Sequence, residues 1–339
     1  MTKRHAIVKL TSLLVVLACV ITPVPPRLVE AEIPYEVTQA VKAGLDYLAR
    51  AQRDDGSWSG NYGQSPGVVG LCLLAFFAHG EVPGHGPYKD TIDKALKFLL
   101  ESANKETGLI SRQGSQPMYN HGFATLALAE AYGMSADPEI ERALRKAVDL
   151  IVRTQNKRGG WRYQPMPYDD DITVSGCQMV ALRAADNAGI SVPRKTIEKG
   201  AEYIESCYAQ GGFGYQPGGS PGIARTGIGV LVLSLTGKED SDKVAKGADY
   251  IQSNFPRNPM SYFYYATYYC SQAMYQVGGS AWKEWDEKMT EQLLRIQVKG
   301  GAERGSWPEA YSEAGRDYAT AMALLALEVK WRYLPIYQR

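Results

Sequence analysis

Hydrophobic and polar residues follow two helical patterns that alternate along the chain. In one pattern, aliphatic residues recur at i, i+3 and i+4 and Lys and Glu occupy the opposite face, which predicts helices with one face in solvent. In the other, the segments are almost uncharged and rich in Gly and Ala, which predicts buried helices with close neighbours. The first kind lies near residues 35–53, 88–104, 137–155, 194–207, 240–254 and 282–297, and the second kind starts near Val68, Gly122, Ile172, Ala224, Tyr264 and Tyr318.

A sequence repeat accompanies this alternation. Its core is an aliphatic residue, a Gln four positions later and then a Gly-x-Trp turn. The complete copies are Leu48, Gln52 and Gly56-Ser57-Trp58; Ile151, Gln155 and Gly159-Gly160-Trp161; and Leu293, Gln297 and Gly305-Ser306-Trp307. Weaker copies place Leu99 before Gly108-Leu109-Ile110 and Ile204 before Gly211-Gly212-Phe213, and a third follows Ile251 without the Gln or the turn. A period of about fifty residues predicts an array of six helical hairpins, which can close into a ring that covers every repeat.

Residues 1–31 differ in character from the repeat. Basic residues precede an apolar run from Leu10 to Ile21, prolines break the run, and Val29-Glu30-Ala31 offers a small-residue cleavage site. This pattern predicts a secretory signal, an exported protein and a single mature domain over residues 32–339. A lipoprotein signal ending at Cys19 is an alternative, which the bulky Leu17 disfavours. The apolar run is too short to span a membrane, so no integral span is expected in the mature chain.

Charge and cysteine usage narrow the function classes. Without residues 1–31 the chain has 33 Lys and Arg against 35 Asp and Glu, a net charge near −2. No basic stripe appears, so neither nucleic acid nor an anionic membrane surface is expected as a partner. The remaining cysteines are widely spaced and read as small buried residues, although an exported protein could pair two of them: Cys72, Cys177, Cys207 and Cys270.

The L-x3-Q-x3-G-x-W pattern resembles the repeat of squalene and hopene cyclases and of protein prenyltransferase β subunits. The resemblance covers the whole mature chain, and the segments YNHGFATLALAEAYG and LEVKWRYLPIY are most similar to exported bacterial prenyltransferase and squalene oxidase repeat proteins. It implies an all-α (α/α)6 toroid of six hairpins with inner and outer rings. It also implies that the repeated Gln and Trp residues tie the turns to neighbouring helices. The fold by itself assigns no reaction.

In such a toroid the inner helices are parallel, so the turns and the N-termini of the inner helices meet at one end, here called the mouth. The catalytic candidates at this end are Asp171, Asp169 and His121. The candidates for lining the cavity or binding a ligand are Tyr119, Tyr163, Asp170, Thr173, Arg225, Tyr262, Tyr265, Tyr269, Glu309 and Asp317. Arg225 and Arg316 could bind an anionic head group, or could pair with carboxylates.

The acidic run at residues 169–173 reads D-D-D-I-T. It resembles the D-x-D-D-T motif with which class II terpene cyclases protonate an alkene or an epoxide. Aligned on Thr173, Asp169 matches the first acid, Asp171 matches the proton donor, and Ile172 replaces the last acid. Clustered carboxylates help to keep one of them protonated, so the missing acid weakens the arrangement. The alternative is that Asp171 caps the following helix.

Other candidates also have two interpretations. The run Tyr262-Phe263-Tyr264-Tyr265, with Tyr269, could stabilise a carbocation by cation–π attraction, or its rings could pack between helices. Rings beside carboxylates would also suit a saccharide, with Asp171 and Asp317 or Glu309 as an acid–base pair. His121 could be a general base or a hydrogen-bonded structural residue.

The zinc site of protein prenyltransferases is not expected. In the run that resembles its histidine-bearing helix, Ala266 stands at the ligand position, and Arg225-Thr226-Gly227-Ile228 offers no Asp or Cys ligand. No metal or other cofactor is therefore predicted. The sequence predicts an exported toroid that binds an apolar isoprenoid, a saccharide or a protein partner at its cavity, with the reaction unassigned. Acid catalysis by Asp171 and a carbohydrate-active toroid are the alternatives, and a dimer over the open ring is a further hypothesis.

Overall fold

The structure is a computed structural model that describes residues 33–339 apart from 59, 62, 113–115, 259, 332, 333, 335 and 337–339. The expected signal sequence, with Cys19, lies outside the described residues. Residues 34–339 form one compact unit. The fold and the site both lie within this unit.

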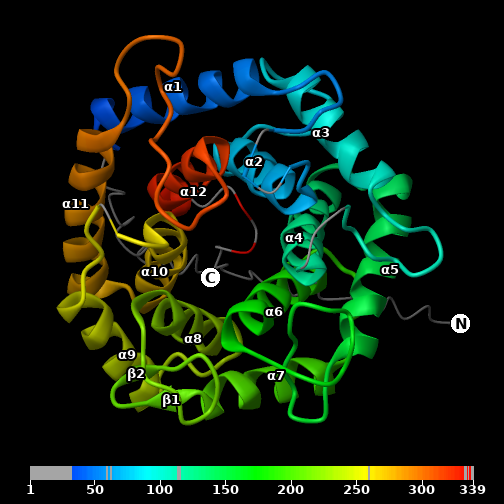
Figure 1. The fold of residues 1–339 in the computed structure, drawn as a ribbon, viewed down its shortest axis with the longest axis vertical. Helices are drawn as coiled ribbons and strands as arrows, with labels where there is room; N and C mark the ends of the chain where they lie inside the picture. The colour runs from blue at the N-terminus through cyan, green and yellow to red at the C-terminus, as the bar shows by residue number, and fades with distance from the viewer. Residues whose placement is uncertain are drawn as a thin grey trace, which may run out of the picture. The chain divides into compact units, whose positions relative to one another are not determined.

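Twelve α-helices among the described residues alternate between an outer and an inner ring (Figure 1). The outer helices are α1 (Tyr35–Ala51), α3 (Lys89–Glu101), α5 (Pro138–Thr154), α7 (Arg194–Ser206), α9 (Asp242–Ser253) and α11 (Gly279–Ile296). The inner helices are α2 (Pro66–Ala78), α4 (Pro117–Ser135), α6 (Ile172–Asn187), α8 (Ile223–Leu235), α10 (Phe263–Val277) and α12 (Arg316–Glu328). A short antiparallel pair, β1 (Tyr208–Ala209) and β2 (Gly212–Phe213), and a 3-10 helix, η1 (Val329–Trp331), complete the described elements.

The predicted division into outer and inner helices is confirmed. Helix α5 buries Ile140, Leu144 and Val148 at helical spacing and turns its charged residues to solvent. Helix α2 is buried at every position and carries no charge, as expected for a helix with neighbours on all sides. Helix α4 begins at Pro117 rather than near Gly122, because a proline is favoured in the first turn of a helix. The β1–β2 pair was not expected.

Each inner helix packs against the next one around the ring, and α12 packs against α2 (Figure 1). Helix α1 contacts α11 and α12, so the last hairpin meets the first. This closure covers both ends of the repeat array.

The glutamines and tryptophans of the repeat tie its turns in place. Gln155 Nε2 donates to the carbonyl oxygens of Gly159, in its own turn, and of Thr196, in the next outer helix, both at 2.9 Å. The same pairs of bonds join Gln52 to Gly56 and Thr91, and Gln297 to Gly305 and Ala40. The indole nitrogens of Trp58, Trp161 and Trp307 donate to the carbonyls of Leu48, Ile151 and Leu293. The structural role expected for these residues is confirmed.

The turn glycine allows consecutive repeats to approach one another. Gly159 has a φ of 96°, and a Cβ placed there would lie 2.1 Å from the carbonyl oxygen of Lys199 in α7. Only glycine adopts this backbone conformation at little cost and leaves room for the carbonyl. Gly56, Gly108 and Gly305 meet the next outer helix in the same way.

The 3-10 helix η1, near the end of the described residues, contacts the inner helices α10 and α12. Leu334 and Ile336 are buried, and the backbone N–H of Ile336 lies close to the carboxyl group of Glu130, in the C-terminal half of α4. The C-terminal segment therefore lies at the end of the ring opposite the mouth.

The four cysteines in the described part of the chain are all buried and free. No helix among the described residues is both long enough and apolar enough to cross a membrane. Within the same residues, no group of three or more His, Cys, Asp or Glu side chains could hold a metal ion.

Candidate functional site

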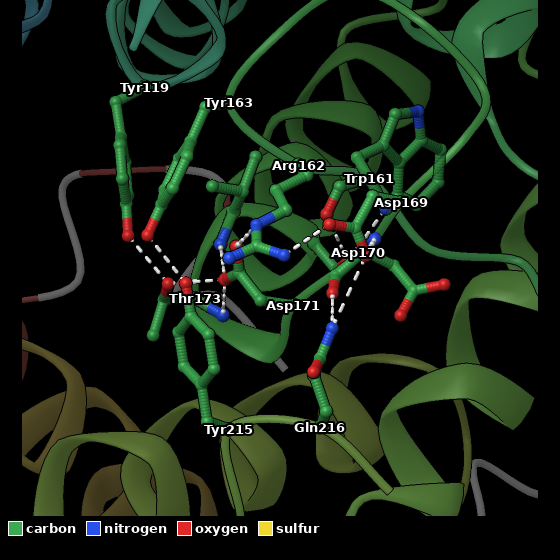
Figure 2. Close-up of polar contacts among 12 residues, drawn as sticks. Tyr119, Trp161, Arg162, Tyr163, Asp169, Asp170, Asp171, Thr173, Tyr215 and Gln216 are labelled. Carbon is green, nitrogen blue, oxygen red and sulfur yellow. Dashed lines mark hydrogen bonds and ion pairs between the residues drawn. The ribbon is translucent and has the colours of Figure 1, made fainter. Parts of the chain in front are cut away.

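The candidate site lies at the start of α6, where the loop of residues 162–171 leaves the Trp161 turn and returns to it. The backbone N–H of Trp161 donates to Ser175 Oγ at 2.8 Å, and the N–H of Asp171 donates to the carbonyl of Trp161 at 3.0 Å. These bonds fix both ends of the loop against α6. The acidic run is therefore held at the mouth (Figure 2).

The two carboxylate oxygens of Asp171 have different environments. Oδ1 accepts from the backbone N–H groups of Thr173 and Val174, at 2.8 and 3.0 Å, and from the Thr173 hydroxyl at 2.5 Å. Asp171 thus caps α6, which agrees with the capping alternative. Oδ2 is buried without a regular hydrogen bond and lies 3.8 Å from Arg162 Nε. Because three donors occupy Oδ1, a proton on this carboxyl must sit on Oδ2.

Burial raises the pKa of Asp171 above its ordinary value. Hydrogen bonds from Thr173, Val174 and Tyr215 lower this pKa by less than burial raises it. An aspartate that retains its proton to higher pH is better suited to act as a general acid. The capping role and an acid role are compatible, because they use different oxygens.

Asp170 has a structural environment. Its side chain has no exposed surface, and it receives two parallel bonds from Arg158, at 2.7 and 2.8 Å, and one from Asn156 at 2.5 Å. This charge-assisted arrangement uses both of its oxygens. Asp170 is therefore turned away from the free oxygen of Asp171.

Asp169 is half exposed and forms an ion pair with Arg162. Burial favours a higher pKa for Asp169, but the backbone N–H of Asp170 and the guanidinium of Arg162 outweigh it, so the pKa lies below its ordinary value. Asp169 is thus an ionised group that holds Arg162 beside Asp171. The following residue, Ile172, is buried, and its N–H donates to the carbonyl of Tyr215 at 3.0 Å.

Three tyrosine hydroxyls converge on the start of α6 (Figure 2). Tyr119 donates to Thr173 Oγ1 at 2.6 Å, and the hydroxyl oxygens of Tyr163 and Tyr215 are 2.5 Å apart. Arg162 lies over the rings of Tyr163 and Tyr215, 5.1 and 5.8 Å from their centroids. The carboxyl of Asp171 is thus surrounded by aromatic rings and one cation.

Further tyrosines extend this aromatic surface across the ring. Tyr265 and Tyr269 of α10 pack edge to face, with 4.9 Å between ring centroids, and Tyr269 is buried. Burial raises the pKa of Tyr119 well above its ordinary value, and the charge of Asp171 adds to this, while a hydrogen bond with Tyr265 opposes it. Tyr119 of α4 therefore lies close to both Thr173 of α6 and Tyr265 of α10.

No family model matches the sequence. The chain is 27% identical over 146 residues to drimenyl diphosphate synthase from Streptantibioticus cattleyicolor, over 42% of this chain and 27% of that protein. The matched segment thus spans about a quarter of that relative.

Solved structures are similar over most of the chain. The type II terpene cyclase MstE from Scytonema, in complex with its substrate geranylgeranyl dihydroxybenzoate, has a TM-score of 0.61 and 15% identity over 88% of this chain and 98% of that chain. Cellobiose 2-epimerase from Spirochaeta thermophila has a TM-score of 0.65 and 14% identity, over 87% and 95%. An inactive variant of an α-1,6-mannanase from Salegentibacter, in complex with α-1,6-mannotriose, has a TM-score of 0.64 and 9% identity, over 87% and 98%.

The chain has the (α/α)6 toroid fold. These toroids have ligands of different classes, and identities this low establish the fold alone. The function of this toroid must therefore be argued from its own side chains.

His121 belongs to the scaffold of the toroid. It is fully buried, its Nδ1 accepts from the N–H of Ile110 at 3.1 Å, and its Nε2 donates to the carbonyl of Ala147 at 3.1 Å. Burial lowers its pKa to about 4, so the ring is neutral near pH 7.

The bond between Ile110 and His121 recurs in other repeats. Ile110 stands at the Trp position of its repeat. The N–H groups of Trp161, Phe213 and Trp307 make the matching bonds to Ser175, Thr226 and Thr320. By accepting from the N–H of Ile110, His121 takes the role that Ser175, Thr226 and Thr320 have in their own repeats.

The remaining sequence candidates occupy different surroundings from Asp171. Asp317 is buried and accepts from the hydroxyl of Tyr47 in outer helix α1 at 2.8 Å. Glu309 is exposed, and Tyr262 is 55% exposed with a φ of 57° at the start of α10. Arg225 is half-buried in the first turn of α8 and lies close to Gly222.

Three residues of the mouth were not identified from the sequence: Arg162, Tyr215 and Glu313. Glu313 is buried and accepts from the N–H groups of Tyr264 and Tyr265 at 3.3 and 2.8 Å. Burial raises its pKa to about 7. It caps α10 from the loop that precedes α12, in the next hairpin, whereas Asp171 caps the helix that directly follows it. The position of Glu313 just before an inner helix was a signal that could have pointed to it.

Proposed function

We propose that this toroid is an exported isoprenoid-converting protein in which Asp171 protonates a carbon–carbon double bond. The observation that carries the proposal is the free, buried Oδ2 of Asp171, since Oδ1 already has three donors. The raised pKa of Asp171 and the tyrosine rings around it support the same role. The partial sequence match to a drimenyl diphosphate synthase supports the substrate class.

In the proposed step, the Oδ2–H bond of Asp171 breaks and a C–H bond forms at one alkene carbon, which leaves a carbocation on the other. A second double bond of the same molecule attacks the cation to close a ring. The reaction ends when the cyclic cation loses a proton to solvent, or when water adds to it and the resulting oxonium ion loses a proton to solvent. Tyr119, Tyr163 and Tyr215 present ring faces or hydroxyls beside the acid. Arg162, 3.8 Å from Oδ2, stabilises the carboxylate that remains.

Asp169 and Asp170 have supporting roles in this proposal. Asp169 holds Arg162 in place, and Asp170 anchors the loop through Arg158 and Asn156. The last acid of the cyclase motif is replaced by Ile172, whose backbone instead holds Tyr215. In this chain the raised pKa of Asp171 thus comes first from burial rather than from a neighbouring carboxylate.

The test is product formation with Asp171→Asn. Asn retains the Oδ1 acceptor of the cap but has no acidic proton, so folding should be kept and turnover lost. The matched control is Asp137→Asn, which makes the same change at the cap of outer helix α5. Each protein is incubated in heavy water with farnesol, geranylgeraniol or squalene, and products are analysed by gas chromatography and mass spectrometry.

Cyclic products that carry one non-exchangeable deuterium with wild type and Asp137→Asn, and none with Asp171→Asn, are the expected result. Equal product formation by Asp171→Asn would overturn the role of Asp171. Native mass spectrometry of protein from its own host shows independently whether an isoprenoid is retained. No retained isoprenoid, together with no turnover by wild type, would leave a binding scaffold as the function.

The carbohydrate-active alternative is not adopted. It requires a second carboxylate that works with Asp171, and its two candidates have other surroundings: Asp317 accepts from Tyr47, and Glu309 is exposed. Saccharide binding by this toroid therefore rests on fold similarity alone.

Export and a partner over the mouth are part of the proposal. Export is tested by sequencing the N-terminus of protein recovered outside the cytoplasm, with Glu32 expected as the first residue. Tyr168 and Tyr311, which are 82% and 80% exposed in the loops before α6 and α12, offer aromatic surface to a partner or a second copy. A mass by light scattering equal to that of one chain would remove the dimer.

A further inference from the structure

A pair of tyrosine hydroxyls lies beside Asp171. Tyr163 follows the Trp161 turn, and Tyr215 follows β2 in the next repeat, yet their hydroxyl oxygens are 2.5 Å apart (Figure 2). Both side chains are half-buried, whereas Asp171 has no exposed surface. The N–H of Ile172 donates to the Tyr215 carbonyl at 3.0 Å, so the backbone that carries this tyrosine is fixed to the residue after Asp171.

An acid that works repeatedly must regain its proton on the oxygen that lost it. Three donors close Oδ1 to a proton, and Oδ2 is buried away from bulk water. Besides Thr173, two side chains among the described residues approach the Asp171 carboxyl closely. Arg162 Nε is 3.8 Å from Oδ2 but does not give up a proton near neutral pH. Tyr215 hydrogen-bonds the same carboxyl, although without a regular geometry to Oδ2.

The third tyrosine hydroxyl at the site, that of Tyr119, cannot return a proton to Oδ2. Tyr119 donates to Thr173, and Thr173 donates to Oδ1 at 2.5 Å. That chain of hydroxyls ends on the oxygen that is already occupied, so it stabilises the carboxylate and fixes the cap. The Tyr163 and Tyr215 pair instead approaches the Asp171 carboxyl through the Tyr215 hydroxyl.

We propose that Tyr215, supplied by Tyr163, returns the proton to Asp171 Oδ2 after each turnover. This inference rests on the proposed function. In the step, Tyr215 O–H transfers its proton to Oδ2 while the Tyr163 hydroxyl gives its proton to Tyr215, and water gives one to Tyr163. Each phenol ends as it began, and the carboxylate becomes a carboxylic acid at the expense of one solvent proton.

Two observations support a concerted transfer. Burial raises the pKa of Tyr215, and the bond to Tyr163 adds to this, so a free phenolate at Tyr215 is disfavoured. Arg162 lies over both rings and stabilises negative charge that develops on either oxygen during transfer. The charged groups that face the pair are thus Arg162, its ion-pair partner Asp169, and Asp171 itself.

The first test needs no substrate. Infrared difference spectroscopy after mixing into heavy water follows the carbonyl stretch of protonated Asp171, which is assigned by its loss in Asp171→Asn. Tyr215→Phe and Tyr163→Phe should slow exchange of this proton by at least about tenfold, because each removes one hydroxyl of the route. Tyr208→Phe, a half-buried tyrosine of β1 outside the site, is the matched control. Exchange in Tyr215→Phe as fast as in Tyr208→Phe would overturn the inference.

The second test uses turnover. With a converted isoprenoid, Tyr215→Phe should slow the steady rate more than it slows the first turnover, and small buffer acids should restore the steady rate. A purely structural role for Tyr215 would slow the first turnover equally and would not respond to buffer acids. If the proposed function is wrong, wild-type protein forms no product. If only this inference is wrong, wild-type protein turns over and Tyr215→Phe has the same steady rate.

Discussion

The side-chain amide of Gln297 donates a 2.8 Å hydrogen bond to the carbonyl of Ala40, which is 257 positions earlier in the chain. The same nitrogen donates to Gly305 at 2.9 Å. Gln297 therefore joins the last hairpin to the first through the same pair of hydrogen bonds by which Gln52 and Gln155 join consecutive hairpins. The ring is closed by the repeat motif itself.

Gln297→Ala should lower the free energy of unfolding by roughly 1–3 kcal/mol, because it leaves two buried carbonyl groups without their donor. Urea unfolding followed by circular dichroism measures the change. Gln252→Ala on α9 is the control, since the one side-chain hydrogen bond of this glutamine within the described part of the chain is an exposed one to Glu284. This substitution should change stability by less than about 0.5 kcal/mol. Equal effects of the two substitutions would contradict a closing role for Gln297.

Gly159→Ala should destabilise the protein more than Gly189→Ala. Both glycines have positive φ, 96° and 83°, so both substitutions carry a backbone cost of roughly 1–2 kcal/mol. Only at Gly159 would the new Cβ also meet a carbonyl, that of Lys199 at 2.1 Å, whereas nothing lies within 4 Å of it at Gly189. Thermal unfolding of the two variants separates the backbone cost from the contact between repeats. Similar melting temperatures would show that α7 can move away.

Arg158→Ala should be more destabilising than Asp170→Asn, although both break the same ion pair. The Arg158 side chain is 58% exposed and Asp170 is fully buried. Removing Arg158 leaves a buried carboxylate without its cation, at a cost of up to about 3–5 kcal/mol, whereas removing the charge of Asp170 leaves an arginine in water. In urea unfolding, the double variant should be more stable than Arg158→Ala alone. If both single variants lose equal stability, Asp170 is better solvated than its surroundings indicate.

Glu130 should make the protein less stable as pH rises. Burial raises its pKa to about 8 in the folded protein, against about 4.5 in an unfolded chain, so its stabilising contribution is complete below pH 4.5 and is lost up to about pH 8. Glu130→Gln should flatten the fall in melting temperature between pH 5 and pH 8, and exposed Glu139→Gln should not. Glu313 and Glu328 act in the same direction and remain in both variants, so the difference isolates Glu130. A parallel pH profile in Glu130→Gln would disprove the assignment.

The fold could be predicted because its determinants are local. Gln155, Gly159 and Trp161 bond groups in their own turn or in the next outer helix, and the same spacing recurs wherever that contact recurs. Phe213 occupies the Trp position of its repeat, and its backbone N–H donates to Thr226 as the N–H groups of two of the tryptophans donate to their partners. The side-chain pattern does not reveal this backbone bond. The alternation of charged and uncharged helices then fixes which ring each helix joins.

The site could be predicted only in part, because its contacts cross between repeats. The acidic run identifies Asp171, but which of its oxygens is free depends on the hydroxyl and N–H groups of α6. Tyr215 reaches Asp171 from the next repeat and belongs to no motif. His121 fits a general base by residue type, and only its bonds to Ile110 and Ala147 place it in the scaffold.

One carboxylate oxygen of Asp171 caps α6 and the other has no regular hydrogen bond, and this difference affects how the sequence can change during evolution. A descendant that lost the proposed chemistry would still be selected to keep Asp or Asn at position 171, because α6 needs its cap. Loss of the chemistry would instead become visible at Arg162, Tyr163 and Tyr215, which contribute little to the cap. Among related sequences, these three positions are therefore expected to vary together while the aspartate persists.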